Sequence, residues 1–171
     1  MFTERLQNAI NDQINAEFYS AYLYLAMSAH FEAEDLPGMA HWMRMQYEEE
    51  VIHAMKFFDF MNDRGARVVL KAIDAPPSEF GSVVDVFAEV LAHEQKVTSL
   101  IHNLYTLALE EGDYPTQSLL KWYIDEQVEE EKSASEVLSR VKMVQDYPPG
   151  VLMIDQELAG RAAPTPPAQE E

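Results

Sequence analysis

The sequence contains no cysteine. This absence excludes disulfide bonds, cysteine-ligated zinc sites and iron–sulfur clusters, and it is compatible with a cytoplasmic location. The first seven residues lack the apolar core of a signal peptide, and no apolar run approaches the length of a membrane span. We therefore expect a cytoplasmic protein with no membrane partner.

Basic residues are also scarce. The chain has 12 Lys and Arg against 30 Asp and Glu, a formal net charge of -18. Such a balance repels phosphate backbones, so we expect no nucleic-acid partner. It attracts cations, although acidity alone is weak support for a metal site. With 171 residues and 47% hydrophobic composition, the chain is long enough for one domain with a sizeable core.

Glycine and proline are few, and they cluster at a few breaks. The stretches between the breaks predict four long helices, over about 4–34, 37–64, 82–111 and 114–145. A short fifth helix is expected over about 150–160. Residues 1–162 would form one domain, and the proline-containing residues 163–171 a disordered tail.

The breaks also indicate how the helices connect. Ser82 and Asp113 are plausible N-caps, and Gly65 and Gly112 stand where C-terminal glycines are common. Residues 65–81 can stretch to roughly 55 Å, whereas a helix of the predicted length is about 42 Å long. The connection can therefore run the length of a bundle and make the second and third helices parallel.

Each long predicted helix carries an apolar stripe that is interrupted near its middle by strong ligand groups. The interrupting residues are Glu17 in the first helix, Glu50 and His53 in the second, Glu94 in the third, and Gln127 and Glu130 in the fourth. Because the middles of neighbouring helices meet whichever way each helix runs, these six residues are predicted to converge.

Four converging carboxylates would repel one another in a dry core. No Lys or Arg stands at the same level of the stripes, so either protons or cations must neutralise them. Four negative charges match two divalent ions, and one imidazole among oxygen donors suits iron or manganese better than copper, with zinc and cobalt as competitors. A single Glu in a stripe is usually a boundary residue, but interruption of all four helices favours a shared site.

Four motifs strengthen this interpretation: Asn15-Ala16-Glu17, Glu49-Glu50-Val51-Ile52-His53-Ala54, His93-Glu94 and Glu126-Gln127-Val128-Glu129-Glu130. In identity and order they resemble the ferritin family, in particular its bacterial and archaeal non-haem branch, and the resemblance covers residues 1 to about 160. It implies an all-α, ferritin-like four-helix bundle with one long crossover and a short fifth C-terminal helix. It also implies ferroxidase activity, in which dioxygen or hydrogen peroxide oxidises Fe(II), and storage of a ferric mineral inside a shell of 24 subunits.

The resemblance assigns roles to individual residues. The first iron would be held by Glu17, Glu50 and His53. The second would be held by Glu50, Glu94 and Glu130, with Gln127 nearby and Glu50 bridging. A third iron site beside the pair would use Glu49, Glu126 and Glu129 and share Glu130. Tyr24 would lie beside the di-iron site as a hydrogen-bond partner and electron donor, with Trp122 in a similar supporting role; ordinary core packing is the alternative for both.

Departures from related families narrow the assignment. The helix containing Gln127 and Glu130 lacks the Glu-x-x-His motif of bacterioferritin, and Ile52 stands where a haem-binding Met would be. A rubrerythrin-like enzyme would carry a cysteine-rich iron domain. A structural or signalling bundle without metal is the rival from another class. The remaining histidines are expected at surfaces or interfaces: His30, His41, His93 and His102.

Overall fold

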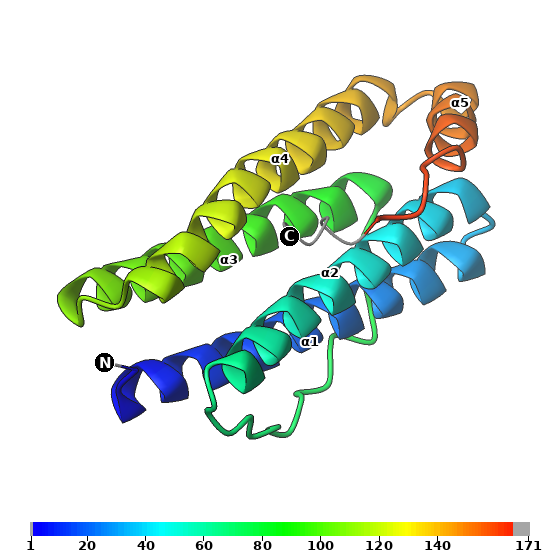
Figure 1. Cartoon of the computed structure of the whole chain (residues 1–171). Helices are drawn as coiled ribbons and strands as arrows, with labels where there is room; N and C mark the ends of the chain where they lie inside the picture. Colours follow the sequence, from blue (N-terminus) through cyan, green and yellow to red (C-terminus); the bar gives the residue numbers. More distant parts are fainter. Residues whose placement is uncertain (1, 166–171) are drawn as a thin grey trace.

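The computed structural model describes residues 2–165, and these residues form five helices and no strand (Figure 1). The helices are α1 (Glu4–Ala33), α2 (Pro37–Asp63), α3 (Val83–Glu110), α4 (Tyr114–Val144) and α5 (Pro148–Leu158). The all-α prediction is confirmed, and the long helices end close to the expected boundaries. Helix α5 begins earlier than expected because Pro148 and Pro149 lie in its first turn, where a missing N–H breaks no hydrogen bond.

The helix ends follow from local chemistry. Ser82 and Asp85 form a capping box at the start of α3, in which each side chain accepts a hydrogen bond from the other residue's backbone N–H. Asp113 caps α4 in a similar way. Gly65 and Gly112 follow α2 and α3 with φ of 68° and 63°, a left-handed conformation that favours glycine.

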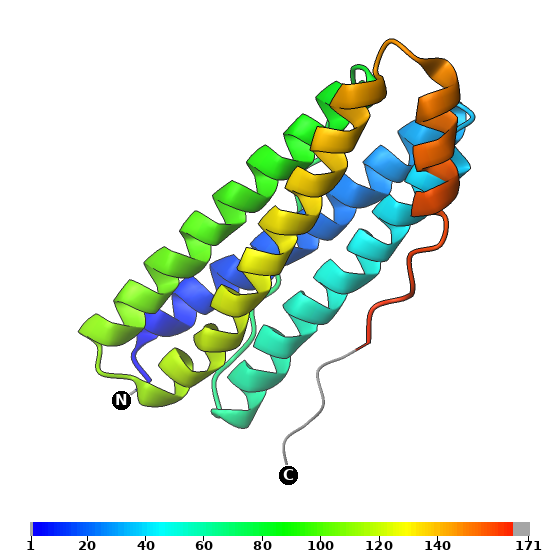
Figure 2. The ribbon, with the colours of Figure 1, turned by 90° about the horizontal axis from the view of Figure 1, so that it is seen from above.

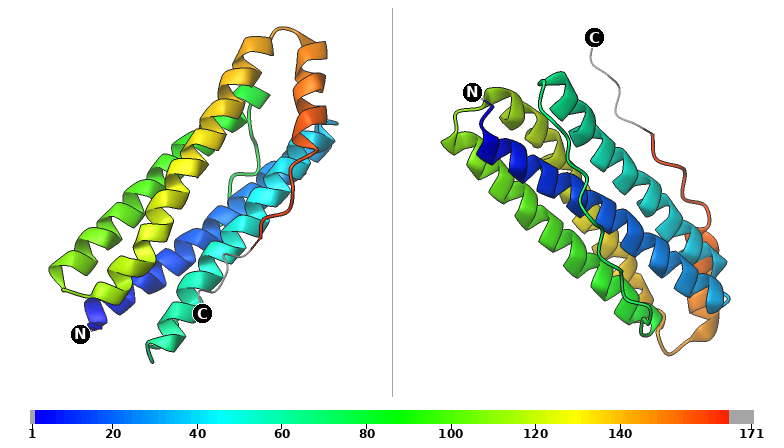
Figure 3. Two further views of the ribbon diagram at one scale, coloured as in Figure 1. Left: turned by 45° about the horizontal axis from the view of Figure 1, so that its top comes forward. Right: turned by 90° about the horizontal axis from the view of Figure 1, so that it is seen from below.

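The connection between α2 and α3 runs along the length of the bundle and makes these two helices parallel (Figures 2 and 3). It is held against α1 by two asparagines one turn apart. Asn11 Oδ1 accepts a hydrogen bond from the Val69 N–H at 2.8 Å, and Asn15 Nδ2 donates to the Ala72 carbonyl at 3.1 Å. The structure thus has two antiparallel hairpins, α1–α2 and α3–α4, joined by one long crossover.

The core consists of two hydrophobic clusters at opposite ends of the bundle. One cluster contains Phe31 stacked on Phe87, with ring centroids 5.8 Å apart. The other contains Phe57 stacked on Tyr123 at 4.0 Å. Along every long helix the two clusters are separated by the level at which the sequence places its polar residues. The hydrophobic clusters therefore hold the helices together on both sides of that level.

Helix α5 packs against the N-terminal end of α2. Asp155 Oδ1 accepts a hydrogen bond from the Met39 N–H at 2.8 Å. The approach requires a glycine, since a Cβ on Gly38 would lie 1.7 Å from the Asp155 carbonyl oxygen. After α5, residues 161–165, which we call the C-terminal strap, turn back alongside α2 (Figures 2 and 3).

The expected C-terminal tail and the expected absence of a membrane span are the two expectations that the helix boundaries leave open. Of the expected disordered tail, residues 166–171 lie outside the described part of the chain, while 163–165 belong to the strap. None of the helices within residues 2–165 combines the length and apolarity needed to cross a bilayer.

Candidate metal centre

The structure buries all six residues that interrupt the apolar stripes. None is more than 4% exposed: Glu17, Glu50, His53, Glu94, Gln127 and Glu130. They come from the middles of four different helices, which is the arrangement that the pattern predicted.

Three of these side chains form a compact group, which we call the inner cluster. Glu17, Glu50 and His53 each offer a ligand atom, and these atoms lie within 4.8 Å of one another. Gln13 Nε2 donates a hydrogen bond to Glu17 Oε1 at 2.9 Å, but the second oxygen of Glu17 and Oε2 of Glu50 are buried and accept none, with His53 Nδ1 the nearest cation-capable group to Glu50 Oε2 at 3.4 Å. Buried carboxylate oxygens without donors are costly unless a cation approaches them, so this donor set fits a metal ion.

Glu94 and Glu130 are instead held by neutral donors. Tyr24 donates a hydrogen bond from its hydroxyl to Glu94 Oε1, and Gln127 Nε2 donates to Glu94 Oε2 at 3.2 Å. Gln46 Nε2 donates to Glu130 Oε2 at 2.8 Å. Tyr24 therefore lies beside the site as the resemblance implied.

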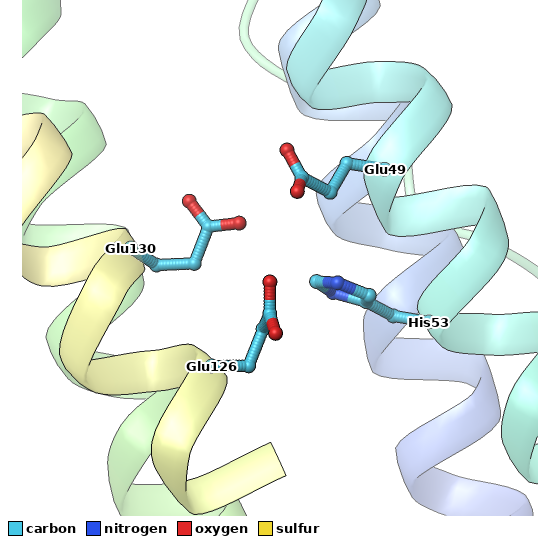
Figure 4. Close-up of side chains that lie close together, drawn as sticks. All are labelled: Glu49, His53, Glu126 and Glu130. Carbon is cyan, nitrogen blue, oxygen red and sulfur yellow. The ribbon is translucent and has the colours of Figure 1, made fainter. Parts of the chain in front are cut away.

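A second group, the outer cluster, lies between α2 and α4 and contains Glu49, His53, Glu126 and Glu130 (Figure 4). Their ligand atoms also lie within 4.8 Å of one another, and Figure 4 shows the four side chains pointing toward one another. Glu49 and Glu126 are half-buried. The group differs from the expected third site, because His53 takes part while Glu129 is exposed on α4 and joins neither cluster.

Burial makes the carboxylates of this level reluctant to ionise. It raises the pKa of Glu17 from 4.5 to about 7. Burial, reinforced by neighbouring carboxylates, raises the pKa of Glu50 and of Glu130 well above the ordinary value, and burial raises the pKa of Glu94 as well. A cation at this level would therefore replace protons.

The pKa of His53 is shifted in the opposite direction. Burial, with a smaller contribution from the nearby charge of Lys56, lowers its pKa from 6.5 to about 4. The imidazole is consequently neutral near pH 7, so one ring nitrogen keeps a lone pair for a metal. Trp122 packs edge-on against this ring with centroids 5.4 Å apart, which restricts its orientation.

Several residues that hold the site's side chains in place were not predicted from the sequence. Gln13 and Gln46 supply the amide donors described above, and Tyr123 donates from its hydroxyl to the His53 carbonyl at 2.7 Å. Gln46 had a detectable signal, since it is a polar residue within the apolar stripe of α2. His93, expected at a surface or an interface, is half-buried and forms a 2.8 Å hydrogen bond with Ser20, because its side of α3 faces α1.

Comparison with known proteins places these features in a family. A model of the ferritin-like domain matches residues 7–144. A bacterial non-heme ferritin of Bacteroides fragilis (strain 638R) is 41% identical over 161 residues, which cover 94% of this chain and 100% of that protein. The chain belongs to the ferritin family. A second family member, a bacterial non-heme ferritin of Staphylococcus aureus (strain USA300), is 35% identical and covers 94% of this chain and 97% of its own length.

Solved ferritin structures have the same fold. A ferritin from the hyperthermophilic archaeon Archaeoglobus fulgidus, described as a novel open pore ferritin, matches with a TM-score of 0.94 and 44% identity, covering 95% of this chain and 100% of that one. A form of the same protein engineered to be closed has the same TM-score and identity and covers 96% of this chain. The expected ferritin-like fold with a fifth C-terminal helix is thus confirmed.

Proposed function

We propose that this ferritin chain is the subunit of an iron-storage protein and that its buried carboxylates bind and oxidise Fe(II). The observation that carries the proposal is the charge balance of the buried level. Four carboxylates from four helices lie there, and within residues 2–165 none of them pairs with a Lys or Arg. Divalent cations would neutralise these four negative charges.

Fe(II) is the substrate at this site. Glu17, Glu50 and His53 bind one ion in the inner cluster, whose ligand atoms are already close together. Glu94 and Glu130 bind a second ion, with Gln127 nearby and Glu50 bridging the two. For this, Glu94 has to exchange its hydrogen bonds from Tyr24 and Gln127 for the metal, and Glu130 has to exchange its bond from Gln46.

The carboxylates favour the product of the reaction. Each Fe(II) gives up one electron to dioxygen or hydrogen peroxide, and the added positive charge is better neutralised by anionic ligands than by water. Tyr24, hydrogen-bonded to Glu94, is placed to supply a further electron. The half-buried residues Glu49 and Glu126, with His53 and Glu130, hold a third ion in the outer cluster. Glu129 is a weaker candidate there because it points to solvent in this structure.

Storage needs an enclosed space, which one subunit cannot supply. We propose a shell of 24 subunits in the cytoplasm, with α5 near a symmetry axis; the family membership supports the assembly, and the cytoplasmic location remains a prediction. Native mass measurement tests the shell. A monomer or dimer as the only species at micromolar concentration would exclude storage while leaving the metal site possible. The rival, a metal-free structural bundle, predicts that an Fe(II) titration shows no binding.

Three consecutive glutamates provide a matched test of the oxidation site. Glu50 belongs to the inner cluster, Glu49 to the outer cluster, and the partly exposed Glu48 to neither. In stopped-flow absorbance, Glu50→Ala is expected to abolish fast oxidation of the first two Fe(II) per subunit. Glu49→Ala should keep the fast phase but change later turnover and the number of Fe(II) oxidised, and Glu48→Ala should change little. With assembly checked for each variant, damage by Glu48→Ala equal to that by Glu50→Ala would contradict the assignment.

A further inference from the structure

Arg161 joins the C-terminal strap to α2. Its Nη2 donates to Glu49 Oε2 at 2.7 Å, and its guanidinium lies over the Trp42 ring, 4.7 Å from the centroid. Its carbonyl oxygen accepts a hydrogen bond from His41 Nε2 at 2.9 Å. The carboxylate that Arg161 engages is thus a member of the outer cluster.

The strap also covers the outer cluster physically. Pro164 and Thr165 line a cavity of about 140 Å³ together with Glu49, His53 and Glu126. A water molecule occupies about 30 Å³ in the liquid, so the cavity has room for an ion that keeps some of its water. An ion that enters the outer cluster from this side therefore meets the strap.

The contact between Arg161 and Glu49 pairs the two charges but leaves part of the guanidinium without a hydrogen-bond partner. Both side chains are about one-fifth exposed, at 22% and 21%, so solvent screens the pair only partly. Nη1 of Arg161 is buried and donates no hydrogen bond, which leaves part of the cost of burying the guanidinium uncompensated. Glu49 can therefore exchange Arg161 for a partner that neutralises the outer cluster more completely.

We propose that Arg161 is a built-in counter-cation of the outer cluster, and that a divalent cation binds there by displacing Arg161 from Glu49 and releasing the C-terminal strap. This inference rests on the proposed metal site and adds a competitor to it. Metal occupancy of the outer cluster and the closed position of the strap then exclude each other. An ion pair that stays closed when the cation binds would also lower the metal affinity through its positive charge, so the position of the strap, and not the affinity alone, distinguishes the two cases.

The test uses Zn²⁺, which is redox-silent, and the assembled full-length protein. The outer cluster is identified as the wild-type binding step that disappears in Glu126→Gln, because Glu126 belongs to this cluster and not to the inner one. The substitution also leaves the Arg161–Glu49 pair intact. Arg161→Gln should raise the Zn²⁺ affinity of that step by about tenfold, equivalent to about 1.4 kcal/mol. Arg140→Gln is the matched control. Arg140 pairs with Glu157 between α4 and α5, so this substitution removes the same charge at a place away from the cluster.

Release of the strap is followed through Trp42. The chain has two tryptophans, so Trp122→Phe leaves Trp42 as the only one, with Arg161 over its ring. Zn²⁺ should shift the emission of Trp42 in this background. The metal-free Trp122→Phe/Arg161→Gln protein should already show the shifted emission and respond little to Zn²⁺.

The outcomes separate the inference from the proposed function. If Zn²⁺ fills the outer cluster and the Trp42 emission does not respond, the displacement is refuted, whether or not Arg161→Gln raises the affinity, and the metal site stands. Zn²⁺ binding to the inner cluster alone also refutes the displacement and leaves the oxidation site intact. If no Zn²⁺ binds to either cluster, both the inference and the proposed metal site fall.

Discussion

Glu17→Gln is expected to stabilise the metal-free protein above neutral pH and to reduce the stabilisation that metal provides. Glutamine has the shape of glutamate without its charge. Its amide oxygen can keep the hydrogen bond from Gln13, which is 2.9 Å long in the wild type. The substitution therefore removes the buried charge with little change in packing.

The magnitude follows from the pKa of Glu17, which burial raises from 4.5 to about 7. The native protein keeps this proton to a higher pH than the unfolded chain does. Stability from this group is fully present below pH 4.5 and is lost as the pH rises to 7 and above. At 1.36 kcal/mol per pKa unit the loss is about 3 kcal/mol, which glutamine avoids because it has no proton to release.

Thermal unfolding with excess chelator at pH 5 and pH 8 measures this effect, at one protein concentration and with assembly verified. The wild type should lose more stability than Glu17→Gln between the two pH values. Glu48→Gln, a substitution of the same chemistry outside both clusters, should behave as the wild type. With anaerobic Fe(II) or with Zn²⁺ the order should reverse, because the variant lacks one ligand and gains less from mass action. A variant that is less stable than wild type at pH 8 without metal, with unchanged pH dependence, would refute the reasoning.

Two further substitutions test the framework around the site. Asp113→Ala should destabilise the protein by about 2 kcal/mol in denaturant titrations, because it removes the α4 cap and a bidentate ion pair with Arg64 whose two bonds are both 2.9 Å. That pair also holds the pKa of Asp113 well below its usual range. The stability that the pair contributes should therefore be present above about pH 4 and lost on acidification, and Asp113→Asn should flatten this pH dependence. Gly38→Ala should lower the melting temperature and expose α5 to limited proteolysis, because its Cβ would overlap the Asp155 carbonyl. Gly160→Ala should have little effect, because its Cβ would stay 3.3 Å from its nearest neighbour. Equal protection of α5 in wild type and Gly38→Ala would show that this contact does not position the helix.

The parts of the structure that depend on local periodicity could be predicted from the sequence. Apolar stripes fix which face of a helix is buried, so the level of Glu17 and Glu94 followed without knowledge of the topology. Side-chain direction within that level could not be predicted. Motif matching assigned Glu129 to the third site. In the structure Glu129 is exposed and lies outside the group of ligand atoms, although its charge adds to burial in raising the pKa of Glu49 and of Glu126, and His53 lies within reach of both clusters.

Contacts made by non-periodic segments were also beyond the sequence. The strap reverses direction after α5, and no repeating pattern indicates that Arg161 returns to Glu49 on α2. The partner of His93 could not be predicted for a related reason. It lies off the apolar stripe of α3, but α1 passes close enough for Ser20 to bond it, and this depends on how the two hairpins pack together.

The division of the core into two hydrophobic clusters affects how the site can diverge among related chains. Because packing on either side of the polar level holds the helices, substitutions within that level change ligand chemistry without removing the contacts that define the bundle. Helix α4 illustrates this freedom, since it presents Gln127 and Glu130 where a Glu-x-x-His pair occurs elsewhere in the superfamily, on an unchanged fold. Mutational drift at the centre of this bundle should therefore alter metal preference and oxidation rate long before it prevents folding.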